Sequence, residues 1–222
     1  PALNEHMLLK VCAYITDPVT TTDELIPSGE TGSFRSNPMG LAEFTLSRRV
    51  PEYIGKAKAV MNHEKNRKNG TCPEEVADAI AKIRTISGFA EIKEEKIDLS
   101  SIIYAVKPGD GSAREQAASC QRVLLGGANI AKEYATKRYR SNLINWGMVP
   151  FVTVSAPDFA DDDYIFVPNI REALEGSMVN IPAYVLGETI KPLTLAIAPL
   201  TKEEKDIIRA GSLINYNRML KK

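Results

Sequence analysis

The segment that most constrains the fold lies at residues 102–116, where an apolar run leads through a glycine-rich turn into an alanine-rich stretch. The run Ile-Ile-Tyr-Ala-Val at 102–106 is typical of a buried strand, because β-branched and aromatic residues favour that setting. The octapeptide at 109–116 reads Gly-Asp-Gly-Ser-Ala-Arg-Glu-Gln, and its two glycines predict a tight turn. Helix-forming residues follow, so the pattern predicts a strand, a turn and then a helix over 114–123.

This turn has the features of an anion-binding site. Backbone N–H groups point outward from such turns, and the start of a helix adds partial positive charge. Arg114 adds a planar fork of donors that fits a carboxylate or a phosphate. Ser112 is placed as a nucleophile or base at the mouth of the site. The alternative is structural: Ser112 and Glu115 have the spacing of a capping box, so Ser112 would only cap the helix. The octapeptide alone leaves both readings open.

Apolar runs and helical periodicity elsewhere predict a mixed α/β chain. Further strands are expected at 7–15, 128–131, 151–154, 164–167, 179–186 and 193–197. Helices are expected from a cap signature at 71–74 to Gly88, over 136–146, and from the capping box of Thr201 and Glu204 to Gly211. Residues 20–32 are polar and predict a loop.

Residues 37–98 differ from the rest of the chain because they are charged and favour helices. We expect one domain over residues 1–222 that carries a helical insertion or peripheral layer at about 37–98. The charges of this region predict a solvated face.

Composition excludes several classes of function. The 28 basic residues balance 28 acidic ones, which argues against a general nucleic-acid or membrane-surface binder. No stretch is long enough to span a bilayer. Three scattered cysteines predict a reducing, cytoplasmic location and argue against a metal or iron–sulfur site built by this chain alone. His6 and His63 lie in polar stretches and are expected at the surface.

Five blocks in chain order resemble the carboxy-terminal swivel domain of the aconitase family of iron–sulfur hydro-lyases. Together they extend from Thr20 to Asn215. The blocks are Thr21, Thr22 and Asp23 with Arg35; residues 109–115; Gly126 and Gly127 with Ile130 and Lys132; residues 140–144 with Gly147 and Pro150; and residues 209–212 with Asn215.

The resemblance implies a three-layer β/β/α swivelling domain of the α/β class. It also implies a reaction, the reversible dehydration of a hydroxy-polycarboxylate such as citrate or isocitrate. The family's [4Fe–4S] cluster is held by cysteines of other domains, so none is expected on this chain alone. The implied partners are the cluster-bearing domains or a large subunit, and the isolated chain is expected to be inactive.

The resemblance also assigns the site residues. Ser112 would be the base that removes a proton beside a carboxylate, and Arg114 would bind and orient the substrate there. Arg35 would hold the far carboxylate, and Asp23 would orient or neutralise basic groups. Ala113 would contact substrate where the family usually has a second serine. No residue of this chain is assigned as a metal ligand.

Ordinary structural roles compete with some of these assignments. Arg114 would form a surface ion pair with Asp110 or Glu115, which is typically worth under about 1 kcal/mol. Arg35 would be a solvated loop residue, and Asp23 would cap its own turn.

Three departures from the family pattern bear on function. Ala113 lacks a hydroxyl, Glu24 replaces a frequent histidine, and Ile26 stands near a frequent serine. They leave open a non-catalytic carboxylate- or phosphate-binding module, or an assembly module. A basic run is expected to be a solvated helix face, with an anion-attracting field as the alternative. It consists of Lys132, Lys137, Arg138 and Arg140.

Overall fold

The computed structural model describes residues 1–27 and 37–222, and within these residues seven strands close into a barrel. Their order around the barrel is β1-β3-β5-β6-β9-β8-β7. The α/β class is therefore confirmed, although the sequence did not predict that the sheet closes. The strands are β1 (His6–Ile15), β3 (Ile97–Ala105), β5 (Gly126–Ala131), β6 (Val149–Thr153), β7 (Tyr164–Val167), β8 (Ile181–Leu186) and β9 (Ile190–Ala196).

The barrel has a parallel wall and an antiparallel wall. Strands β1, β3, β5 and β6 pair in parallel, and β9, β8 and β7 pair antiparallel. Two antiparallel pairs, β1 with β7 and β6 with β9, join the walls. Because parallel neighbours need crossover connections, the helices between these strands are carried to the outside of the parallel wall.

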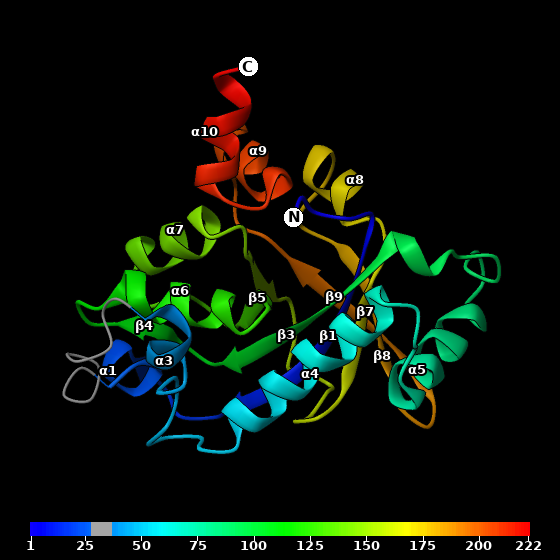
Figure 1. Cartoon of the computed structure of the whole chain (residues 1–222), viewed down its shortest axis with the longest axis horizontal. Helices are drawn as coiled ribbons and strands as arrows, with labels where there is room; N and C mark the ends of the chain where they lie inside the picture. Colours follow the sequence, from blue (N-terminus) through cyan, green and yellow to red (C-terminus); the bar gives the residue numbers. More distant parts are fainter. Residues whose placement is uncertain (28–36) are drawn as a thin grey trace.

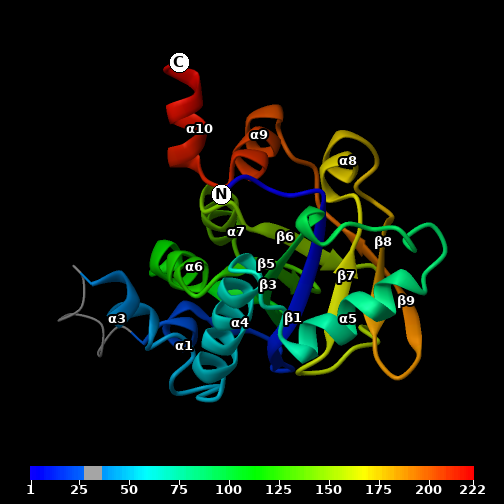
Figure 2. The same ribbon diagram turned by 45° about the vertical axis from the view of Figure 1, so that its right-hand side comes forward.

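The helices lie around this barrel in separate groups. Figure 1 shows α1, α3 and α6 on one side, α5 on the opposite side, and α8, α9 and α10 at the top. In Figure 2 α10 extends away from the body of the molecule. The helices are α1 (Thr22–Leu25), α3 (Pro38–Ala42), α4 (Tyr53–Lys68), α5 (Glu74–Arg84), the short 3-10 helix η2 (Glu94–Lys96), α6 (Arg114–Val123), α7 (Lys137–Asn145), α8 (Ile170–Glu175), α9 (Lys202–Ala210) and α10 (Leu213–Leu220).

Two apolar clusters follow from the alternation of side chains along the strands. Met7, Leu9 and Val11 of β1 belong to the cluster inside the barrel, whereas Leu8 belongs to the cluster beneath the helices. Successive strand residues point to opposite faces, so β1 has one face on each cluster. The parallel wall therefore lies between the interior of the barrel and the helices that cover its outer face.

Residues 37–98 contain the expected helices, and α4 packs against β1 and β3 while α5 packs against β8. Whether this region is an insertion stays a prediction. The expected helix at 71–88 is shorter: α5 begins at Glu74 with Pro73 as its N-cap and no capping side chain, and it ends at Arg84. A proline before the first turn fixes the backbone for a helix without a side-chain cap.

The predicted loop at 20–32 is wrong in its first part. Residues Thr20–Thr21 form the short strand β2, which pairs in parallel with β4 (Pro108–Asp110), and α1 follows directly. The capping box of Thr21 and Glu24 explains the helix, because it satisfies two N–H groups at the helix start.

One surface prediction is wrong, and a second is right in part. His6 is only 7% exposed, because it begins β1 and packs against the rings of Phe89 and Phe166. Three members of the basic run are exposed as expected, namely Lys132, Lys137 and Arg138. The fourth, Arg140, is partly buried and donates to the carbonyl of Ala198 at 2.7 Å. No described helix is long and apolar enough to cross a membrane.

Candidate functional site

The short sheet formed by β2 and β4 brings together two segments that are far apart in the sequence. Thr20 pairs with Pro108, and Thr21 pairs with Asp110. These segments follow β1 and β3, which end at the same edge of the parallel wall, and ligands of α/β proteins bind at such edges. A pocket of about 320 Å³ lies between them. It is lined by Thr21, Thr22, Asp23, Asp110, Gly111, Ser112 and Ala113.

Both glycines of the octapeptide are required by the shape of the turn. Gly109 has φ +102° and Gly111 has φ +131°, which side chains disfavour. A Cβ atom on Gly109 would lie 2.3 Å from Cγ of Tyr139, and one on Gly111 would lie 2.2 Å from Oγ1 of Thr22. The turn therefore packs against α7 on one side and α1 on the other.

Ser112 is exposed at the pocket and does not cap the helix that follows. Helix α6 begins at Arg114 with Ala113 as its N-cap, and no side chain bonds to its first N–H groups. Within residues 1–27 and 37–222, the Ser112 hydroxyl has no hydrogen-bond partner. The capping alternative is wrong, and the hydroxyl is free to meet a ligand.

Arg114 lies immediately after the pocket residues and is partly buried. Its Nε atom is enclosed and has no hydrogen-bond partner among the described residues. In the same part of the chain it forms no ion pair with Asp110 or Glu115, so the expected surface ion pair is absent. An unpaired guanidinium group is a strong binder of carboxylates and phosphates.

The structure brings three of the five predicted site residues to one pocket. Asp23, Ser112 and Ala113 line it, and Asp23 is exposed there. Arg114 adjoins the pocket without lining it. Arg35 lies outside the described residues. The chemical roles of all five residues stay predictions.

The departures at residues 24 and 26 have structural explanations. An oxygen of Glu24 accepts from the N–H of Thr21 at 2.7 Å, and the Thr21 hydroxyl accepts from the N–H of Glu24 at 3.2 Å. Ile26 is fully buried in the cluster beneath the helices. These two residues stabilise α1 and its connection rather than line the pocket.

Thr22 is a pocket residue to which the sequence analysis assigned no role. It lines the pocket, and its hydroxyl lies against Gly111 with no hydrogen bond to any described residue. It therefore offers a second hydroxyl beside Ser112, although Ala113 has none. The sequence signal that could have indicated Thr22 was its position between Thr21 and Asp23 in the first of the five matched blocks.

A buried ring of hydrogen bonds supports the turn from behind. The amide of Gln121 donates to the Tyr139 hydroxyl at 2.9 Å, which donates to Asn129 at 2.7 Å, and Asn129 donates back to Gln121 at 2.6 Å. Burial raises the pKa of Tyr139, so its hydroxyl stays protonated. Because the Tyr139 ring contacts Gly109, this network positions the turn relative to α6, β5 and α7.

Cys12 and Cys120 are buried, and Cys72 is partly exposed. Burial raises the pKa of Cys12 to about 12 and that of Cys120 to about 11, so both remain thiols at neutral pH. No group of three or more His, Cys, Asp or Glu residues within the described part of the chain is arranged to hold a metal ion. The location of an iron–sulfur cluster on complementary domains stays a prediction.

Comparison with known proteins gives a likeness of structure and none of sequence. No protein-family model matches the chain, and no curated protein matches its sequence. Among solved structures, the chain is similar to 3-isopropylmalate dehydratase (leuD) from Methanocaldococcus jannaschii, with 18% sequence identity and a TM-score of 0.57. The match covers 97% of this chain and 95% of that one. At this identity the likeness shows the fold alone, and the chain therefore shares the fold of a dehydratase over nearly its whole length, in agreement with the resemblance to the aconitase family.

Proposed function

We propose that this chain is the swivel component of an aconitase-like hydratase that reversibly dehydrates a hydroxy-polycarboxylate. One observation carries the proposal: the Ser112 hydroxyl is exposed in the pocket, without a capping role, next to an arginine that has no ion-pair partner among the described residues. The fold shared with 3-isopropylmalate dehydratase and the five sequence blocks support the same class of reaction.

Such a reaction needs a base for the carbon beside a carboxylate, and Ser112 is our candidate. A serine hydroxyl is a weak base unless its anionic form is stabilised. The N–H groups at the start of α6 and the positive charge of Arg114 provide that stabilisation. The glycine turn then fixes the position of the hydroxyl relative to these groups.

The remaining groups fit the binding of carboxylates. Arg114 would hold one carboxylate through two parallel hydrogen bonds, worth about 1.5–3 kcal/mol each. The Thr22 hydroxyl would donate to the same substrate, and Arg35 is the proposed partner of the far carboxylate. Asp23 would orient these basic groups. These side chains are not soft thiolate ligands, so they fit the substrate rather than a cluster.

The proposed partner is a chain or set of domains that bears a [4Fe–4S] cluster. When bound there, the cluster supplies Lewis-acid activation of the leaving hydroxyl. Closure of the two parts would bring Ser112 and Arg114 to the substrate and exclude water.

The test is an assay of the chain reconstituted with its cluster-bearing partner, using citrate, isocitrate and 3-isopropylmalate as substrates. Ser112→Ala is expected to lower turnover by about 10²–10⁴-fold, the usual contribution of a positioned acid or base. The matched control is Ser119→Ala, which removes a hydroxyl from the middle of α6. Unchanged turnover with Ser112→Ala would exclude this serine as the base.

A second candidate, a non-catalytic module that binds carboxylates or phosphates, is favoured by Ala113, which brings no hydroxyl to the pocket. Calorimetry of citrate with the isolated chain would then show binding, while the reconstituted assembly would show no turnover. If the chain only assists assembly, Arg114→Ala would leave citrate binding unchanged and deletion within 37–98 would abolish association.

A further inference from the structure

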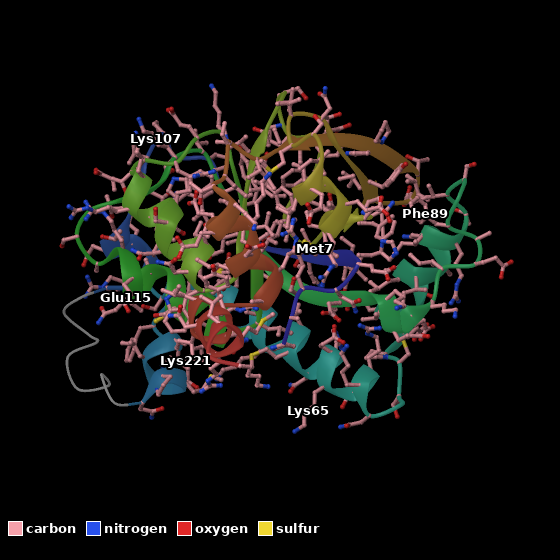
Figure 3. All side chains as sticks on the ribbon, turned by 90° about the horizontal axis from the view of Figure 1, so that it is seen from above. Met7, Lys65, Phe89, Lys107, Glu115 and Lys221 are labelled. Atoms are coloured by element: carbon pink, nitrogen blue, oxygen red, sulfur yellow. The ribbon has the colours of Figure 1, made fainter. Side chains whose placement is uncertain are left out.

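A second cavity lies at the edge of the barrel opposite to the site turns. Its volume is about 260 Å³, and it is lined near the starts of β1, β3 and β5 by Met7, Leu99 and Gly127. The N-terminal residues 1–4 and Gly211 after α9 close it. Figure 3 looks onto this face and labels Met7 near the middle, whereas Glu115, next to Arg114, lies toward one end.

Arg122 gives this cavity an unbalanced positive charge. Its guanidinium group donates to the carbonyls of Gly126 at 3.0 Å and Gly211 at 3.2 Å. Within the described residues no carboxylate lies within ion-pair distance of it. Burial lowers the pKa of Arg122, and the more distant Asp98 opposes this effect. An enclosed charge without a counter-ion is costly and favours the arrival of an anion.

Three charged side chains of the lining, Glu64, Lys68 and Asp98, already have partners. Glu64 pairs with Arg67 at 2.8 Å, and Lys68 pairs with Asp98 at 3.1 Å. The charges within these pairs cancel, so Arg122 supplies the net positive charge of the side chains that line the cavity.

The rest of the wall is mainly apolar, with one available hydroxyl. Leu3, Met7, Leu125 and Ile208 line it, and the buried Ser100 makes no hydrogen bond with its hydroxyl to any described residue. A ligand that suits this wall combines one anionic head with a short apolar body.

We propose that this cavity binds a small monocarboxylate, with the carboxylate at Arg122 and Ser100 and the apolar body against Leu3 and Met7. At about 30 Å³ per water-sized group, the cavity holds roughly nine non-hydrogen atoms. Hexanoate, with eight, is a suitable probe. The site is independent of the proposed hydratase chemistry, because it uses none of the residues of the turns.

The test is a titration of the ¹⁵N-labelled chain with hexanoate, followed by NMR and by calorimetry. Saturable changes of chemical shift are expected at the backbone amides of Gly126, Gly127 and Gly211. Hexanamide, a neutral molecule of the same shape, is expected to bind at least about tenfold more weakly, because it cannot pair with the guanidinium group.

Two variants separate the charge from the cavity. Arg122→Met is expected to weaken the binding of hexanoate at least about tenfold. Arg84→Met, which removes an exposed arginine of α5, is expected to leave the affinity for hexanoate unchanged. Because Arg122→Met also removes two bonds to carbonyls, Leu3→Trp provides a second test by filling the cavity and preserving those bonds. It is expected to abolish binding.

Three results would overturn the proposal. These are equal affinity for hexanoate and hexanamide, shifts confined to residues 109–114, and no saturable binding at millimolar concentration.

Discussion

Helices α6 and α9 are each preceded by a hydroxyl residue, Ser112 or Thr201, with a glutamate three positions later, yet the two helices begin differently. In α9 the Thr201 hydroxyl accepts from the N–H of Glu204 at 3.1 Å, and the Glu204 carboxylate accepts from the N–H of Thr201 at 2.9 Å. In α6 neither Ser112 nor Glu115 bonds to the helix start, and Ala113 is the N-cap.

The difference shows that a capping pair is used only where the preceding backbone permits it. The left-handed backbone of Gly111, at φ +131°, turns the chain just before Ser112 and leaves its hydroxyl outside the helix. At α9 no such turn intervenes, so the hydroxyl stabilises the helix. The start of α6 therefore gives up a stabilising contact and gains a hydroxyl that faces a pocket.

The largest expected effect tests the free hydroxyl directly. Ser112→Ala is expected to lower the turnover of the reconstituted enzyme by about 10²–10⁴-fold. Its free energy of unfolding should change by no more than about 0.5 kcal/mol, because no cap is lost. Parallel turnover assays and urea unfolding measure both quantities. A stability loss of about 1 kcal/mol with normal turnover would mean that Ser112 caps α6 after all.

The next effect tests what stabilises α6 in place of a cap. Tyr139→Phe keeps the ring against Gly109 but leaves the buried Oδ1 atom of Asn129 in β5 without the hydroxyl donor and removes one acceptor of the Gln121 amide in α6. We expect a loss of about 1–3 kcal/mol in urea unfolding. Tyr216→Phe is the matched control, because Tyr216 makes no side-chain hydrogen bond to the described residues. An equal loss of unfolding free energy in both variants would mean that the ring of hydrogen bonds does not stabilise α6.

A smaller effect is expected at α9. Thr201→Ala breaks a complete capping box and should lower stability by about 1 kcal/mol. Turnover of the reconstituted enzyme should not change, since α9 lies away from the pocket. Thermal unfolding together with the turnover assay measures this, and a loss of turnover at constant stability would contradict the comparison.

The smallest expected effect is a pH dependence of stability that comes from His6 in β1, outside both helix starts. Burial lowers the pKa of His6 and outweighs the raising effect of Glu5, and its Nδ1 atom accepts from the N–H of Asn169 at 3.0 Å. The unfolded chain therefore binds more protons than the folded chain below about pH 6.5, and stability falls as the pH is lowered from there. His6→Gln should flatten this slope in unfolding experiments. A slope unchanged by His6→Gln would assign the pH dependence to other groups.

The sequence predicted those elements whose signals are local. Helix α6, strand β7 and the capping box at Thr201 occur at the predicted residues because periodicity and caps act over a few neighbours. Closure of the barrel depends on β1 pairing with both β3 and β7, and such distant pairings leave no local pattern. The short strand β2 exists only because β4 lies beside it.

The site was predictable to the extent that the matched blocks contain it. Those blocks included Asp23 and Ser112, and the structure adds that they line one pocket. Whether Ser112 caps α6 depended on the backbone of Gly111, which the sequence does not display. The ring of Gln121, Asn129 and Tyr139 was not predictable, because its members come from three different elements.

The pairing of β2 with β4 has a consequence for assembly. The two segments are held together by backbone hydrogen bonds and by the contact of Thr22 with Gly111 before any partner arrives. Ordering flexible loops on association costs conformational entropy, and segments that are already fixed avoid most of that loss. The proposed partner would thus meet two segments that are already arranged, and its affinity need not be spent on arranging these turns.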